Sequence, residues 1–220
     1  MSNKGFIFDL DGVIVDTAKY HFLAWRNLAN SLDIDFSEKE NEQLKGVSRV
    51  RSLEKILEWG NKTISDHEFT ALMAQKNEEY LAYIDKMDRS ELLPDVLHYL
   101  DLLKEKEQGI ALGSASKNAR RILKQIHIID KFEAIVDGND VSAAKPDPEV
   151  FLNAAEALNI TPENCIVFED SVAGVTAANR ANMISIGIGD KEVLGHADYV
   201  FKDFTELSEE FIDELINRKN

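Results

Sequence analysis

Two aspartates stand two positions apart, directly after a short apolar run. Residues 5–8 are Gly-Phe-Ile-Phe, and Asp9, Leu10, Asp11 and Gly12 follow them. Because side chains alternate along an extended chain, Asp9 and Asp11 should point to the same side. Gly12 allows a sharp turn after them. Carboxylates placed in this way can be catalytic, or they can be turn-favouring residues that cap the next segment.

Three further polar segments follow later in the chain. Residues 112–118 could offer backbone N–H groups and the Ser114 hydroxyl to an anion, or they could form an ordinary polar connection. Lys145 precedes Pro-Asp-Pro, which stiffens the backbone before a helix start, although it could also be a solvated surface lysine. Glu169 and Asp170 end another apolar run, where they could equally be a helix N-cap and its neighbour.

The elements that must position these residues alternate between strands and helices. Apolar runs typical of buried strands occupy residues 5–8, 110–112, 134–136, 165–168 and 184–188, and helical patterns occupy residues 96–106, 119–126, 148–158 and 172–181. This alternation predicts an α/β fold, a Rossmann-like parallel sheet with helices on both faces. The four polar segments can then converge at the carboxyl ends of the strands, where ligands of such sheets bind.

Residues 17–90 break this alternation. They show three apolar helical faces, formed by Phe22, Trp25, Leu28, Ala29 and Leu32, by Leu53, Ile56 and Leu57, and by Phe69, Leu72, Met73, Tyr80 and Leu81. We therefore predict two domains: a core of residues 1–16 and 91–220, and a small all-helical domain of residues 17–90. The helical domain should lie over the carboxyl ends of the strands.

The composition excludes several classes of protein. The chain has 220 residues, 44% of them hydrophobic, and a formal net charge of −15, which argues against binding to nucleic acid or to a membrane surface. A small anionic substrate is compatible with this charge if cations gather locally. The single cysteine, Cys165, fits a reducing compartment, and the N-terminus shows no apolar targeting segment. We expect a cytoplasmic monomer.

The polar segments together resemble the motifs of the haloacid dehalogenase superfamily of phosphotransferases, over the whole chain. The matching residues are Asp9 and Asp11, Ser114, Lys145, and Glu169 and Asp170. The resemblance implies that Asp9 attacks phosphorus while Asp11 acts as general acid and then as general base. Ser114 and Lys145 would offset the negative charge around phosphorus.

The same resemblance implies a magnesium site. Asp9, Asp170 and the main-chain carbonyl of Asp11 would hold Mg²⁺, and Glu169 would bind it directly or through water. Carboxylate and carbonyl oxygens are ligands that Mg²⁺ prefers, and no cluster of His or Cys in the sequence suggests zinc.

Within the superfamily, residues 16–25 and 44–49 look like the hinge and cap-loop motifs of the β-phosphoglucomutase family, and so do residues 114–118 and 137–141. That family interconverts β-D-glucose 1-phosphate and glucose 6-phosphate through β-glucose 1,6-bisphosphate, which primes the reaction. The implied substrate-binding residues are Trp25, Leu44, Lys45, Gly46, Val47, Ser48, Arg49, Ser52, Ser114, Ala115, Ser116, Lys117 and Asn118. A sugar-phosphate phosphatase and a catalytically silent binding protein are the alternatives.

A bisphosphate must bind in both orientations, which requires a second phosphate site. Arg49 is the expected second clamp, unless it is a surface arginine at a helix start. The family implies that Thr17 and His21 position Asp11, although His21 could be an interdomain histidine without a chemical role. Arg51 should add charge near the cap loop, and the pair at residues 120–121 should extend the basic side of the cleft.

Overall fold

A six-stranded parallel sheet forms the centre of the larger part of the molecule. The computed structural model describes residues 3–44 and 47–218. The strand order is β3-β2-β1-β4-β5-β6, and every neighbouring pair is parallel. The strands are β1 (Gly5–Phe8), β2 (Gly109–Gly113), β3 (Ala134–Val136), β4 (Cys165–Glu169), β5 (Ile184–Ile188) and β6 (Tyr199–Phe201). The first five lie where the sequence predicts them, and the α/β fold class is confirmed.

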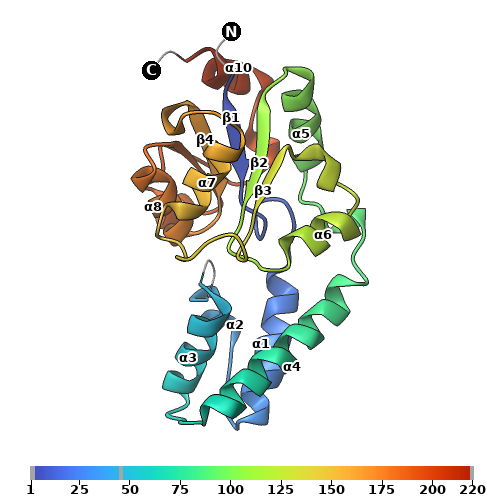
Figure 1. Ribbon diagram of the computed structural model, residues 1–220, viewed down its shortest axis with the longest axis vertical. Coiled ribbons are helices and arrows are strands. Elements are labelled where there is room, and N and C mark those ends of the chain that lie inside the picture. Colours follow the sequence, from blue (N-terminus) through green and yellow to red (C-terminus); the bar gives the residue numbers. More distant parts are fainter. Residues whose placement is uncertain (1–2, 45–46, 219–220) are drawn as a thin grey trace.

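Helices cover both faces of this sheet (Figure 1). They are α5 (Val96–Glu105), α6 (Ala119–Gln125), α7 (Glu149–Ala157), α8 (Val172–Arg180), α9 (Lys191–Leu194) and α10 (Glu209–Asn217). Phe6 and Phe8 pack with α5, α6 and α10 on one face, whereas Ile7 packs with α7 and α8 on the other. Alternation along β1 therefore buries apolar side chains in both directions. Within the described residues, no helix is long and apolar enough to cross a bilayer.

Three elements near the C-terminus, α9, β6 and α10, are not among those predicted. The three residues of β6 are only half-buried and form the edge of the sheet. A run this short, between Asp198 and Lys202, carries too little apolar pattern to indicate a strand. Because β6 and α10 lie beyond the last predicted strand, they extend the sheet and cover one face without altering the order of the strands that carry the site.

A second body of helices lies beyond one end of the sheet (Figure 1). It contains α1 (Ala18–Ser31), α2 (Glu38–Glu42), α3 (Arg49–Trp59) and α4 (Asp66–Ile84). Trp25, Leu53 and Ile56 belong to its own apolar cluster, separate from the two clusters of the sheet. The short α2 was not expected, because its sequence Glu-Lys-Glu-Asn-Glu has no apolar face; it is held by a capping box between Ser37 and Glu40.

Phe168 is the aromatic centre of one face of the sheet, and its replacement tests how far packing there stabilises the site-bearing strands. It stacks on Phe8 with ring centroids 4.7 Å apart and is 1% exposed. Phe168→Ala should lower the free energy of unfolding by about 3–5 kcal/mol, because it leaves a cavity in a packed core. Urea unfolding measures this change. Leu152→Ala, at a residue that is 37% exposed on α7, should cost below about 1 kcal/mol, and equal losses would contradict the prediction.

Candidate active site

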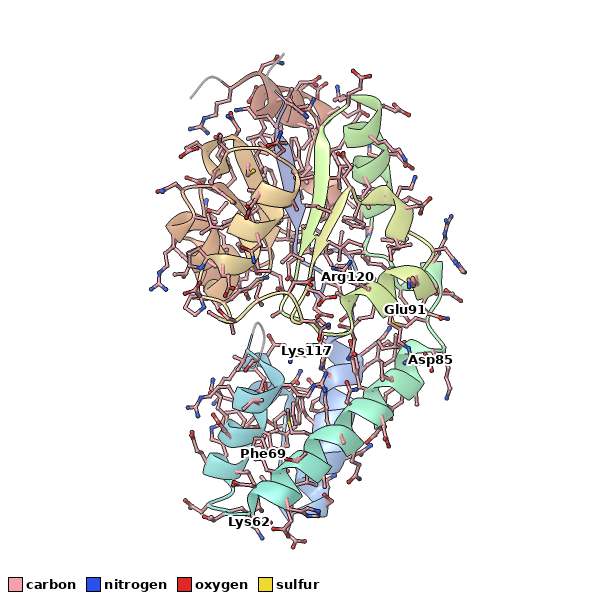
Figure 2. The ribbon with its side chains drawn as sticks, viewed as in Figure 1. Lys62, Phe69, Asp85, Glu91, Lys117 and Arg120 are labelled. Atoms are coloured by element: carbon pink, nitrogen blue, oxygen red, sulfur yellow. The ribbon has the colours of Figure 1, made fainter. Side chains whose placement is uncertain are left out.

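A cleft of about 1130 Å³ lies between the carboxyl ends of the strands and the four helices described at residues 18–84. Its lining combines residues that follow β1, β2 and β4 with residues of α1, α3 and α4. Figure 2 shows Lys117 and Arg120 at the edge of the sheet body that faces these helices. The topology thus brings together segments that are more than a hundred residues apart in the chain.

The ammonium group of Lys145 is the centre of the site. Its Nζ lies 2.6 Å from Asp9 Oδ1 and 2.6 Å from Glu169 Oε1, and it donates to the carbonyl of Gly113 at 3.1 Å. All three N–H donors of the Lys145 ammonium group are therefore used. Although burial disfavours its charge, the carboxylates of Asp9 and Glu169 raise the pKa of Lys145, so it stays protonated. Lys145 is a buried cation and not a surface lysine.

Glu169 is held in place at the end of β4 by its neighbours. Its Oε2 accepts hydrogen bonds from the backbone N–H of Ser171 at 2.8 Å and from the Ser171 hydroxyl at 2.9 Å. A Cβ atom at Gly174 would come within 1.8 Å of the carboxyl group, so the glycine leaves the room that Glu169 occupies. Both oxygens of Glu169 consequently face protein donors: one faces Lys145 and the other faces Ser171.

Asp11 lies beside Thr17, one of the two residues that the resemblance implies should position it. The Thr17 hydroxyl, which is fully buried, donates to Asp11 Oδ1. Burial raises the pKa of Asp11, against the lowering effects of this hydrogen bond and of the positive charges of Lys145 and Lys76. A raised pKa suits a group that must carry a proton for part of a reaction cycle.

The oxygens around Asp9 fit a hard divalent cation. Burial, together with the negative charges of Glu169 and Asp11 nearby, raises the pKa of Asp9 to about 7, although the positive charge of Lys145 lowers it. Asp170 lines the same cleft as Asp9. Its Oδ2 would be 2.1 Å from a Cβ atom at Gly12, and the φ of Gly12, +81°, is one that residues with a side chain rarely adopt. Among the described residues, no three His, Cys, Asp or Glu side chains are grouped to hold a metal. The carboxylates of Asp9 and Asp170, which both line the cleft, are oxygen donors of the kind that Mg²⁺ prefers.

The loop after β2 contains both polar side chains and backbone donors. Ser114 Oγ accepts from the N–H of Ser116, and Ser116 Oγ accepts from the N–H of Asn118. These bonds use two of the amides that were expected to face an anion, while the Ser114 hydroxyl keeps its own hydrogen to donate. Ala115 and Lys117 also line the cleft.

The predicted cap residues approach the cleft from the opposite side. Those that line it are His21, Trp25, Leu44, Val47, Ser48, Arg49 and Ser52. Lys45 and Gly46 lie outside the described residues. Ser48 caps the start of α3 by accepting from the N–H of Arg51, and the Ser52 hydroxyl donates to the Ser48 carbonyl. Asn118 Nδ2 also donates to Asn77 Oδ1 of α4 at 3.0 Å, which links the two bodies directly.

Sequence reasoning missed a buried lysine on α4. Lys76 is 2% exposed, its Nζ lies 2.8 Å from His21 Nδ1, and it sits 4.6 Å from the ring centre of Trp25. The structure thus places His21 against Lys76 and against the ring of Tyr80, with no hydrogen bond to Asp11 among those described. Nothing in the helical pattern of α4 distinguishes Lys76 from its solvated neighbours, although its position one helical turn before Tyr80 could have suggested the buried face.

Arg49 is a cation without a carboxylate partner among the described residues. It is partly buried, and burial lowers its pKa. Arg51, on the same helix, instead pairs with Glu54 at 3.0 Å and with Glu58 at 2.8 Å. The two arginines therefore differ in what they offer to the cleft: Arg49 has charge available, and the charge of Arg51 is neutralised on its own helix.

The expectation that Arg120 and Arg121 extend the basic side of the cleft is wrong. Arg120 Nη2 donates to Asp140 at 2.9 Å and to the carbonyl of Ile135 at 2.6 Å. Arg121 donates to both oxygens of Asp85, at 2.6 and 2.7 Å. Acidic residues that are distant in sequence neutralise both charges, so the pair joins segments of the fold.

Comparison with known proteins accords with this geometry. A family model described as haloacid dehalogenase-like hydrolase matches residues 3–182. The chain belongs to this family. Within the haloacid dehalogenase-like hydrolases, it is 43% identical to the β-phosphoglucomutase of Bacillus subtilis (strain 168), over 96% of this chain and 94% of the relative. It is 31% identical to the phosphorylated carbohydrates phosphatase of Thermotoga maritima, over 80% of this chain and 81% of that protein.

Among solved structures, the crystal structure of β-phosphoglucomutase from Clostridium difficile matches with a TM-score of 0.94 and 44% identity, covering 98% of each chain. This agreement spans both bodies of this haloacid dehalogenase-like chain. The resemblance inferred from the four motifs is confirmed.

The pKa of Lys76 provides a test of this buried cation. Burial, followed by the charge of Arg49, lowers its pKa from 10.5 to about 7. Between these values the unfolded chain holds a proton that the folded chain lacks, so this group makes the free energy of unfolding rise with pH. The free energy of unfolding of the wild type minus that of Lys76→Met should therefore become more positive from pH 7 to pH 9, by about 1 kcal/mol per pH unit.

Urea unfolding at pH 7, 8 and 9 measures this difference. Lys104→Met is the matched control, because Lys104 is exposed on α5 and its replacement should change the free energy equally at each pH. A constant difference for Lys76→Met as well would show that its ammonium is not buried.

Proposed function

We propose that this chain is a Mg²⁺-dependent β-phosphoglucomutase, which interconverts β-D-glucose 1-phosphate and D-glucose 6-phosphate through β-glucose 1,6-bisphosphate. The observation that carries the proposal is the second cation across the cleft. Asp9 and Lys145 form a centre for one phosphate, and Arg49, without a carboxylate partner among the described residues, lines the same cleft from α3. A sugar bisphosphate requires a binding site for each of its two phosphates. The similarity to two proteins named β-phosphoglucomutase supports the same choice.

In the proposed reaction, a carboxylate oxygen of Asp9 forms a bond to phosphorus while the bond from phosphorus to the sugar oxygen breaks. Asp11 gives its proton to the departing oxygen. When that phosphorus is the one on O1 of β-glucose 1,6-bisphosphate, D-glucose 6-phosphate leaves. The 6-hydroxyl of a β-D-glucose 1-phosphate molecule then gives its proton to Asp11 as its oxygen takes the phosphoryl group from Asp9, which regenerates the bisphosphate. Lys145 and the Ser114 hydroxyl offset charge around phosphorus.

Mg²⁺ would be held by Asp9, Asp170 and the main-chain carbonyl of Asp11, with Glu169 beside them. When bound, it supplies positive charge that allows an anionic carboxylate to approach an anionic phosphate. Burial and the negative charges of Glu169 and Asp11 raise the pKa of Asp9, and a divalent cation bound there would offset both effects, which supports this assignment.

We propose further that residues 17–90 act as a cap domain over a core of residues 1–16 and 91–220. A mutase must keep water from the phosphorylated Asp9 until a sugar hydroxyl arrives, and a closing cap does so. Thr17, which bonds Asp11 at the boundary, would couple the position of the cap to that of the acid. Leu44, Val47 and Trp25 would shape the sugar pocket.

The alternative is a sugar-phosphate phosphatase with the same core and the same first step. The 31% identical relative from Thermotoga maritima is named a phosphatase of phosphorylated carbohydrates. Such an enzyme would need no clamp for a distal phosphate, so Arg49 favours the mutase. We further propose a cytoplasmic monomer that acts on a free sugar phosphate, and the unpaired, buried Cys165 is consistent with a reducing compartment.

Coupling glucose 6-phosphate formation to a dehydrogenase tests the function. The assay contains β-glucose 1-phosphate, Mg²⁺ and catalytic β-glucose 1,6-bisphosphate, and phosphate release is followed in parallel. Asp9→Asn should lower turnover at least about a thousandfold, because an amide is a poor nucleophile. Asp130→Asn, at an exposed residue outside the cleft, is the control and should retain turnover. Release of phosphate without glucose 6-phosphate would identify a phosphatase.

Arg49 and Arg51 form a matched pair for testing the second phosphate site. Arg49→Ala should lower mutase turnover about ten- to a hundredfold, since it removes a charged hydrogen-bond donor to the distal phosphate. Phosphorylation of Asp9 by acetyl phosphate, which has no distal phosphate, should fall much less. Arg51→Ala should leave both rates near those of wild type. Equal losses of the two reactions in Arg49→Ala would show that Arg49 does not bind the distal phosphate.

A further inference from the structure

The loop at residues 114–118 is supported from behind by a turn at residues 137–140. This turn follows β3, which neighbours β2 in the sheet. Ser114 N donates to the carbonyl of Val136, and Gly138 N donates to the carbonyl of Ser116. A Cβ at Gly138 would lie 2.3 Å from the carbonyl oxygen of Ala115, so only glycine permits this close approach.

Asn139 joins the turn to the loop through its side chain. Its Nδ2 donates to the main-chain carbonyl of Lys117 at 3.1 Å and to Asp137 Oδ1 at 2.8 Å. One amide group therefore connects a residue of the cleft wall to a buried carboxylate. Asn139 itself is exposed and does not line the cleft.

Asp137 anchors this connection. It is 1% exposed, and its Oδ1 accepts from both the backbone N–H and the side chain of Asn139. Its Oδ2 makes an ion pair with Arg120 Nε at 3.1 Å, without the geometry of a directed hydrogen bond. Arg120 also holds Asp140, whose carboxylate accepts from Asp137 N. The turn is thus a closed polar network behind the loop.

We propose that Asn139 is a positioning residue that sets where Ser116, Lys117 and Asn118 face the substrate, with Asp137 and Arg120 holding it in register. It acts through the Lys117 carbonyl and touches no reacting atom. The hydrogen bonds of Lys145 to Asp9, Glu169 and Gly113 do not pass through this network. The turn therefore governs binding of the sugar phosphate beyond the Asp9 centre. The identity of that substrate rests on the proposed function.

Asn139→Ala tests the proposal, with Asn217→Ala as the matched control. Asn217 Nδ2 likewise donates to one main-chain carbonyl, that of Asp213 at 2.8 Å, but it lies on α10, outside the cleft. We expect Asn139→Ala to raise KM for β-glucose 1-phosphate about three- to tenfold, as loss of a hydrogen bond would, and to lower kcat less. The rate with acetyl phosphate should change less than KM. Asn217→Ala should leave all three values unchanged.

Hydrogen exchange of the Ser116 and Asn118 amides provides a readout that needs no substrate. Both amides should exchange several-fold faster in Asn139→Ala, and not in Asn217→Ala, at equal thermal stability. In Asn139→Asp, a carboxylate would stand against Asp137 and the Lys117 carbonyl, so its exchange should be faster still.

Unchanged exchange at these amides in both Asn139 variants would overturn the proposal, whatever the enzyme's activity. If the wild type fails to convert β-glucose 1-phosphate while the exchange rates respond as expected, the proposed function falls and the positioning role stands. A uniform loss in KM, kcat and the acetyl phosphate rate, with exchange unchanged, would assign Asn139 a general structural role instead.

Discussion

The buried ammonium of Lys145 is the interaction on which the rest of the site depends. A buried cation is tolerated only when its donors are satisfied and its charge is balanced. Asp9 after β1, Glu169 at the end of β4 and the carbonyl of Gly113 in β2 do this together. The ends of three strands must therefore meet at one point. Gly174 leaves room for the carboxyl group of Glu169, and Ser171 holds that group in place.

The negative net charge of the chain and the positive charges in the cleft are found in different parts of the molecule. The formal net charge is −15, yet the cleft holds cations on both of its sides. Lys145 is balanced by carboxylates, whereas Arg49 has no such partner among the described residues and Lys76 contacts a histidine. Arg51, Arg120 and Arg121 are equally basic in sequence, but each is paired with an acidic residue. Local pairing, and not the count of basic residues, decides which cations can meet an anion.

The boundary between the two bodies carries contacts that belong to neither alone. Thr17 bonds Asp11, and Asn77 of α4 bonds Asn118. Arg121 and Asp85 form an ion pair near the return of the chain to the sheet, where Figure 2 shows Asp85 and Glu91. These contacts place Asp11, the loop at residues 114–118 and the helical body in one connected arrangement. A movement of the helical body relative to the sheet would therefore change the contacts of Asp11 and of residues 114–118.

Apart from the short α2, the amino-acid sequence determined the order of strands and helices from residue 5 to residue 188, because apolar periodicity is a local property that each segment carries by itself. It also indicated that Asp9, Ser114, Lys145 and Glu169 belong to one site, since parallel strands end at a common edge. Only the tertiary structure decided that Lys76 is buried against His21, that Arg120 and Arg121 are neutralised, and that Asn139 supports Lys117. Burial and pairing depend on what other segments bring nearby, and no single segment encodes that.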